Sequence, residues 1–452
     1  RVGEFDEFVG YHLERAAQLR TELGQRDETT RAIAHRAFEH LTAAGRRALH
    51  RGDMATAANL LVRASGLVEA EDPDRLRMAW ALGHALNETG AMTASAALLD
   101  ETIALARAAG DEAAAGYAEC VRWTSRVVTD PEMDVDDWES SADRLIALFE
   151  EAGDHLGAAL AWAQKAYVYW LREHLQASGE AAGRAIAHAE AAGEVFLVSE
   201  MREHHLATVG LGPTPLAEVG PFVQQRLEEA RSRGDRRLER GALVALAIQA
   251  ALQRRFDEGR VLMAEAREIS KQLGRTIEYW ASAQPISRIE WFAGDLDAAA
   301  ASLHESCEEL EALGETAFLS TSAAMLAEVE LERGDRASAE RWLDVARRTT
   351  SRGDRSSVTV IEVVEGWLLA LDGDPAAGGH LRRALELVDD TDSPLWRTDV
   401  RLQVAQALTE QRPDEAGRLA REAIELSSAK GLEVLVDRGR AILDRLGERS
   451  TP

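Results

Sequence analysis

Small and larger apolar residues recur along the chain at positions i, i+4 and i+7, a spacing that places them on one face of a helix. The first and third positions are small, and the middle one is usually larger. Small side chains on such a face let two helices approach closely, while the middle residue fills the space between them. The seven sets are Ala57, Leu61 and Ala64; Ser95, Leu99 and Thr102; Ser178, Ala182 and Ala185; Gly259, Met263 and Ala266; Ala299, Leu303 and Ser306; Ala339, Leu343 and Ala346; and Ala416, Ala420 and Ala423.

Turn residues divide this pattern at steps of about 40 residues. A helix often ends on a glycine with positive φ, and an aspartate that follows can cap the next helix. The spacing therefore predicts an all-α solenoid of about ten helix hairpins, each helix being roughly 16 to 18 residues long. The turns between hairpins are Gly110, Gly153, Gly193, Gly234, Gly274, Gly314, Gly353 and Gly431; those within hairpins are Gly52, Gly90, Gly294, Gly334 and Gly373, with Arg254 in phase.

These hairpins resemble the tetratricopeptide repeat (TPR). Leu82-Gly83 and Leu326-Ala327 stand in the first helices where that repeat has its Leu-Gly pair. The unit is about 40 residues rather than about 34 and lacks the usual proline after the second helix. The resemblance implies a right-handed TPR-like array with longer helices, whose first helices line a concave surface. We expect a lead-in at residues 1–40, the solenoid at 41–448 with a bend near 210–215, and a polar tail at 449–452.

The N-terminal stretch Glu7 to Gly24 does not follow the 40-residue spacing. Together with Ala34 to Asp53 it resembles the region that follows the nucleotide-binding and winged-helix parts of bacterial STAND-type signalling ATPases. The resemblance implies the C-terminal repeat region of an actinobacterial-type protein of this kind, linked to adenylate/guanylate cyclase-like or LuxR-type transcriptional activator proteins. The chain starts at Arg1 rather than Met, so we expect an upstream ATPase region.

The motifs for chemistry are missing from the sequence. It has no Gly-rich phosphate loop ending in Gly-Lys-Ser/Thr, so any ATP site is expected upstream. Adjacent helical residues such as His204 and His205 point about 100° apart and chelate one metal poorly. The acids between Asp130 and Asp137 lack the glycine and final glutamate of a Ca²⁺ loop. We therefore expect no catalytic residues, no cofactor and no metal site.

Charge limits the choice of partner. The formal net charge of −26, from 78 acidic and 52 basic residues, repels phosphate backbones and argues against nucleic-acid binding. The same charge favours a basic or apolar protein segment, including one from the parent's own ATPase, while a small-molecule effector is a further option. Only two cysteines, Cys120 and Cys307, and no long apolar stretch predict a cytoplasmic protein that does not enter a membrane.

Aromatic residues are concentrated on the predicted first helices. Tryptophan, tyrosine and arginine dominate binding hot spots, so these residues predict a groove that binds a partner. The competing interpretation is that the rings fill gaps between repeats. We interpret the chain as a binding and regulatory module; the alternatives are a scaffold for oligomerisation and an enzyme fragment with its own pocket. The partner-binding candidates are His84, Asn87, Tyr167, Trp170, Arg288, Trp291 and Trp367.

Overall fold

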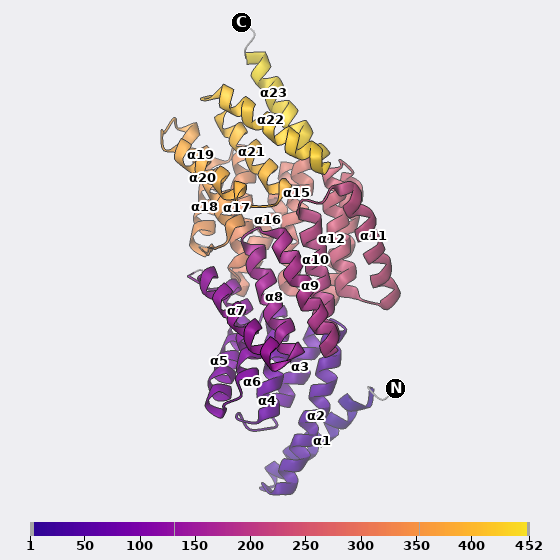
Figure 1. Ribbon diagram of the computed structural model, residues 1–452. Coiled ribbons are helices and arrows are strands. Elements are labelled where there is room, and N and C mark those ends of the chain that lie inside the picture. The colour runs from indigo at the N-terminus through magenta and orange to yellow at the C-terminus, as the bar shows by residue number, and fades with distance from the viewer. Residues whose placement is uncertain (1–3, 131, 352, 450–452) are drawn as a thin grey trace.

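The computed structural model describes residues 4–130, 132–351 and 353–449, and this part of the chain folds into helices joined by short turns (Figure 1). Ten hairpins follow a leading helix α1 (Glu4–Glu22), and α23 (Glu433–Arg449) ends the array. The predicted all-α, TPR-like solenoid is thus confirmed. The polar tail predicted at 449–452 lies almost entirely outside the described residues. The first helices are α2 (Glu28–His50), α4 (Pro73–Glu88), α6 (Glu112–Thr129), α8 (His155–Leu171), α10 (Val195–Leu211), α12 (Arg236–Leu252), α14 (Thr276–Ala281) with α15 (Ala283–Ala293), α17 (Ala317–Arg333), α19 (Arg355–Leu371) and α21 (Pro394–Leu408).

The second helix of each hairpin packs antiparallel to the first. These helices are α3 (Met54–Ser65), α5 (Met92–Ala109), α7 (Val135–Ala152), α9 (Leu175–Ala192), α11 (Leu216–Arg233), α13 (Phe256–Gln272), α16 (Leu296–Leu313), α18 (Arg336–Thr349), α20 (Ala377–Asp389) and α22 (Pro413–Lys430). All residues of the seven predicted small-residue sets are buried. Gly83 of α4 shows why: a Cβ there would lie 2.8 Å from Leu99 Cδ2, so the leucine of the second helix occupies the space that the glycine leaves.

The turns take the conformation that the spacing predicts, with one exception. Twelve of the thirteen glycines that mark the spacing have positive φ, and Arg254 has φ 62° at the equivalent place. Glu173 fills the same role in another hairpin with φ 55°, which the sequence analysis missed. Gly353 does not have positive φ, so the prediction is wrong there; α18 already ends at Thr349. A Cβ at Gly353 would lie 2.0 Å from Val135 Cγ2, so close approach of α7 explains this glycine.

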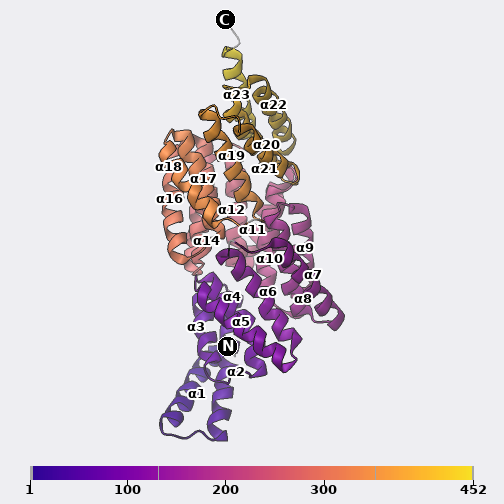
Figure 2. The same cartoon turned by 90° about the vertical axis from the view of Figure 1, so that its left-hand side faces the viewer.

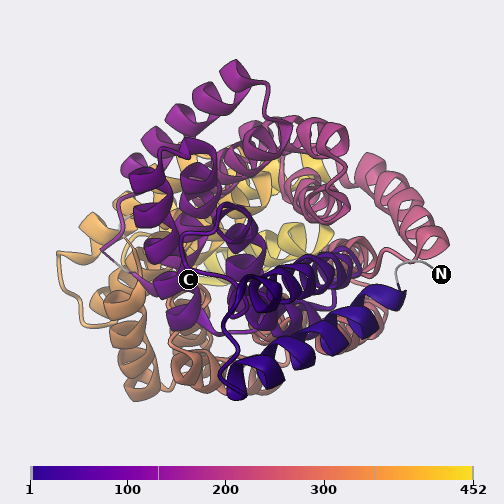
Figure 3. The ribbon, with the colours of Figure 1, turned by 90° about the horizontal axis from the view of Figure 1, so that it is seen from below.

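The ten hairpins wind into two stacked coils along the long axis (Figures 1 and 2), around a common centre when seen along that axis (Figure 3). Turns within hairpins of the first coil contact turns between hairpins of the second. Asp392 accepts hydrogen bonds from the backbone N–H of Leu175 and of Gln176, both at 2.8 Å, and so caps α9 from 217 and 216 residues away. Lys430 Nζ donates to the carbonyl oxygens of Gly212 and Thr214.

Each contacting turn lies between two turns of the other coil. Glu173 accepts a hydrogen bond from Ser356, 183 residues away, and its carbonyl oxygen accepts one from Asp392 N. The turn after α10 also lies between two turns of the second coil. Ser393 Oγ donates to Leu211 O at 3.1 Å, and Lys430 Nζ donates to Gly212 O. Separations of about 180 and about 218 residues correspond to four and a half and five and a half repeats. A coil therefore holds about five hairpins, and its turns nest between those of its neighbour.

No helix of the described part of the chain combines the length and the apolar character that a membrane span needs.

Candidate functional site on the inner face

Charged side chains from four first helices meet in one buried cluster, so these helices face the inside of the array. Arg275 Nε lies 2.8 Å from Glu88 Oε2, and Arg275 Nη1 lies 3.2 Å from Glu203 Oε2. Arg237 Nη2 lies 3.2 Å from Glu88 Oε2 and Arg237 Nη1 lies 3.5 Å from Glu200 Oε1. We call this set the Arg–Glu cluster; its members are Glu88, Glu200, Glu203, Arg237, Arg240, Arg275 and Glu278.

The Arg–Glu cluster holds one more carboxylate than guanidinium group. Burial alone would raise the pKa of Glu203, but Arg240, Arg275 and Arg237 hold it below its usual value. Burial raises the pKa of Glu278 above its usual value, and the pull of Arg275 does not offset that effect. The surplus negative charge is therefore reduced by favouring the neutral form of Glu278. The cluster joins α4 of the first coil to α12 and α14 at the start of the second.

Two of the predicted residues, His84 and Tyr167, border this cluster. His84 is only 8% exposed, and its Nε2 lies 3.5 Å from Glu88 Oε1 and 3.9 Å from Glu200 Oε1. Tyr167 donates its hydroxyl hydrogen to Glu200 Oε1 at 2.8 Å. His84, Glu88 and Glu200 place one ligand atom each within 4.8 Å of one another. Because Arg237 lies close to both carboxylates, a metal cation there would meet a like charge.

Partly exposed rings from α8 and α10 adjoin the Arg–Glu cluster. The ring centroids of Tyr167 and Trp170 both lie 5.2 Å from that of His204. His204 Nε2 is 2.8 Å from Ser178 Oγ, and burial lowers the pKa of His204 to about 4, so the imidazole is neutral at neutral pH. We call Tyr167, Trp170 and His204 the inner aromatic patch. It presents apolar ring surface together with hydrogen-bonding edges.

A second group of charges surrounds Trp291 near the C-terminal end. The guanidinium carbons of Arg288 and Arg438 lie 4.3 and 4.0 Å from the centre of the Trp291 ring, which makes two cation–π contacts. Trp291 Nε1 donates to Glu332 at 2.5 Å, and Arg288 Nη2 lies 3.2 Å from Glu328 Oε2. Burial raises the pKa of Glu328 to about 7, against the attraction of Arg288. This Trp291 cluster fastens α23 to α15 and α17.

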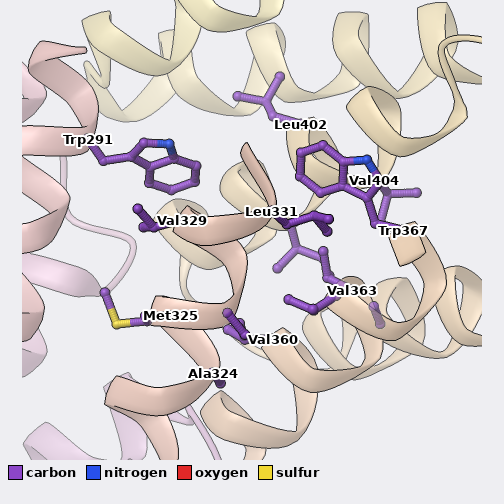
Figure 4. Close-up of a cluster of buried hydrophobic side chains, with 14 of the residues drawn as sticks. Trp291, Ala324, Met325, Val329, Leu331, Val360, Val363, Trp367, Leu402 and Val404 are labelled. Atoms are coloured by element: carbon purple, nitrogen blue, oxygen red, sulfur yellow. The ribbon is translucent and has the colours of Figure 1, made fainter. Parts of the chain in front are cut away.

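The structure separates the seven predicted residues into two groups. Tyr167, Trp170 and Arg288 keep part of their surface exposed. The other four are buried: His84, Asn87, Trp291 and Trp367 are 8%, 7%, 5% and 8% exposed. Asn87 Nδ2 donates to Ser125 Oγ at 2.9 Å, while the two tryptophan rings pack among Val329, Leu331, Val363 and Val404 (Figure 4). A partner-binding role for all seven stays a prediction.

Sequence reasoning missed the members of the Arg–Glu cluster. Glu88 and Arg275 are 187 positions apart; Glu88 ends α4, and Arg275 is the residue before α14. Nothing local marks either residue as buried. Only the winding of the coils brings them together, because it sets which first helices meet at the centre.

Three solved structures are similar to this chain. The Rap protein complexed with competence and sporulation factor has a TM-score of 0.56 and 11% identity, covering 81% of this chain and 99% of its own. Cut9–Hcn1 of the APC/C has a TM-score of 0.53 and 14% identity, covering 97% and 89%. NprR in complex with its cognate peptide NprX has a TM-score of 0.50 and 12% identity, covering 76% and 98%. These likenesses concern the fold alone.

No protein-family model and no curated protein sequence matches the chain.

Proposed function

We propose that this array is a regulatory binding module that takes a basic or apolar protein segment on its inner face. The observation that carries the proposal is the inner aromatic patch, which is partly exposed and whose Tyr167 donates a hydrogen bond to the carboxylate of Glu200. Aromatic rings supply stacking area, and the carboxylate of Glu200 attracts cationic side chains. Two proteins of similar fold, Rap and NprR, form complexes with competence and sporulation factor and with the cognate peptide NprX.

Binding at this place would act on the junction between the two coils. Glu200 connects the two sites, because it accepts from Tyr167 in the patch and faces Arg237 in the cluster. Desolvation largely offsets the attraction within buried ion pairs. The Arg–Glu cluster therefore holds the two coils together only weakly, although it is buried. A cationic segment that competes for Glu200 would loosen Arg237 and shift the second coil against the first. Binding of the segment would thereby change the position of the second coil relative to the first.

The proposal also gives a source for the bound segment. The N-terminal resemblance to STAND-type signalling ATPases supports a segment of an upstream ATPase region, held as an autoinhibitory contact. The array would then control the output of the domains that precede it. A scaffold for oligomerisation is the second candidate, favoured by the exposed Phe5 and Phe8 on α1 and Leu23 just after it.

The test is a screen of basic, acidic and apolar ten-residue peptides, followed by fluorescence anisotropy on the best binder. We expect basic or apolar peptides to bind, and Trp170→Ala to weaken binding about tenfold, roughly 1.4 kcal/mol. Trp342→Ala is the matched control, because Trp342 is also partly exposed and lies against a histidine, His304, but on a second helix. If Trp170→Ala lowers the melting temperature and leaves binding intact, the rings only fill space between repeats. A mass that rises with protein concentration would support the scaffold instead.

A further inference from the structure

A cavity of about 320 Å³ lies between α13 and the broken first helix α14–α15, away from the inner aromatic patch. One wall is apolar and the other carries cations. Its volume is at the lower end of the range for small-molecule sites. The residues that matter are Met263, Arg267 and Lys271 from α13, Tyr279 from α14, and Ile286 and Ile289 from α15.

The break in the first helix has a local cause beside this cavity. Pro285 has no backbone N–H, so the hydrogen bond to Ala281 O cannot form, and α14 stops at that residue. Ser282 then starts a new run, with Ile286 N donating to Ser282 O at 3.2 Å. The carbonyl oxygen of Trp280 instead accepts from Ser306 Oγ of α16 at 2.8 Å. The kink sits between Tyr279 and Ile286, which both line the cavity.

The three cations that line this cavity differ in their pairing. Arg260 at its edge is paired with Glu290 at 2.6 Å and with Asp257 at 2.8 Å. Within the described residues, Arg267 and Lys271 have no ion-pair partner.

Arg267 is held in position by a contact that leaves its hydrogen-bond donors available. Its guanidinium carbon lies 4.2 Å from the centre of the Tyr279 ring, which fixes the group by a cation–π contact. Its Nε is buried and has no hydrogen-bond partner. Glu268, the acid at the mouth, is exposed and accepts a hydrogen bond from Gln272 at 3.0 Å. The guanidinium group therefore keeps donors for an acceptor that enters the cavity.

We propose that this cavity binds a small carboxylic acid with an aromatic or short aliphatic body. The carboxylate would pair with Arg267 and Lys271, which stand one turn apart on α13, and the body would pack on Met263, Ile286 and Ile289. A guanidinium group binds carboxylates with paired hydrogen bonds. The apolar wall selects against inorganic anions, because an inorganic anion would leave the apolar side chains in contact with water. The cavity shares no lining residue with the Arg–Glu cluster or the inner aromatic patch, so its test does not depend on the proposed partner.

The test uses 3-phenylpropionate and its amide as probes, with calorimetry and ligand-observed NMR on the whole chain. We expect the acid to bind with a Kd of about 1 mM and the amide at least tenfold more weakly. Arg267→Gln and Lys271→Gln should each weaken the acid several-fold. Ala264→Trp should abolish binding, because this exposed residue lines the cavity and the indole would fill it.

Arg233→Gln on neighbouring α11 is the matched control, since Arg233 is exposed and lies outside the cavity. Circular dichroism melts establish that each variant is folded. If Arg267→Gln does not fold, the Ala264→Trp variant and the comparison of the acid with its amide still test the proposal. Three results would overturn the proposal: no saturable binding of the acid, equal binding of acid and amide, or equal affinity of the Arg267→Gln and Arg233→Gln variants.

Discussion

Three carboxylates are buried deeply enough to hold a proton near neutral pH. Burial raises the pKa of Glu173, Glu315 and Glu328 to about 7 in each case. Glu173 accepts from Ser356 at the contact between coils, and Glu315 accepts backbone hydrogen bonds at the start of α17. These bonds lessen the effect of burial without cancelling it. Each residue has a folded pKa above its unfolded value of 4.5, so its contribution to stability is full below pH 4.5 and is lost as pH rises through 7.

We expect the melting temperature to rise when the pH is lowered from about 8 to about 6. Each of the three groups should contribute about 1 kcal/mol over that range. Glu328→Gln should raise stability at pH 8 and remove part of the pH dependence, because the amide stays neutral. Calorimetric melts across the pH range measure both effects. Glu309→Gln, an exposed position on α16, is the control and should leave the pH dependence unchanged; a flat profile for the unaltered protein would contradict the pKa assignments.

At this scale the sequence predicts what is local. Arg254 could be placed in a turn because it falls in phase with the glycines, and its φ is positive as expected. Glu328 could not be recognised as buried, since its neighbours in α17 include Glu330 and Glu332. Arg288, which pairs with it, and Asp399, whose negative charge raises its pKa further, come from other repeats.

The hairpin is the element that carries stability, and its strength lies in close packing of small residues. Ala339 and Ala346 of α18 are fully buried, as the spacing predicts. Alanine there lets α18 approach α17, so the contact has no room for a larger side chain. The 40-residue spacing places Gly353 at a helix end, and this prediction is wrong. The glycine is required because α7 of the neighbouring coil approaches it too closely for a side chain.

Ala339→Leu should destabilise the protein by roughly 1–3 kcal/mol, because the added carbons overpack the contact between α17 and α18. Urea denaturation measures the change in the free energy of unfolding. Ala337→Leu is the matched control, since Ala337 is exposed on the same helix. Equal effects of the two substitutions would mean that helix propensity, rather than packing, sets the result.

The stacking of two coils distinguishes the whole molecule from a simple repeat array. In a simple array each repeat contacts only its neighbours, and stability is close to a sum of local terms. Here Asp392 caps α9, and Lys430 bonds the turn before α11. The sequence could not predict these contacts, because they depend on a small rotation per hairpin accumulated over five repeats. The predicted bend near 210–215 corresponds in place to one of these contacts.

The contacts between coils should make unfolding cooperative. We expect the unaltered protein to unfold in urea as a single transition. The double variant Asp392→Ala, Lys430→Met should unfold in two steps or with a lower dependence on urea, because the first coil loses its ties to the second. Asp374→Ala is the control: this side chain accepts from Ala376 N within its own turn, so only the midpoint should fall. A single transition of unchanged slope in the double variant would argue against coupling.

Nested turns also restrict how such a protein can gain or lose repeats over evolution. Repeat proteins commonly grow by duplication of whole units, and a simple array accepts a new unit anywhere. In this chain the contacts Gly52–Leu273, Glu88–Arg275, Glu173–Asp392 and Gly212–Lys430 all span the stretch from 212 to 273. A duplicated hairpin in that stretch would separate every one of these pairs by one unit, so Asp392 would no longer face the start of α9. An addition beyond Lys430 would disturb none of them, so lengthening and grafting belong at the ends.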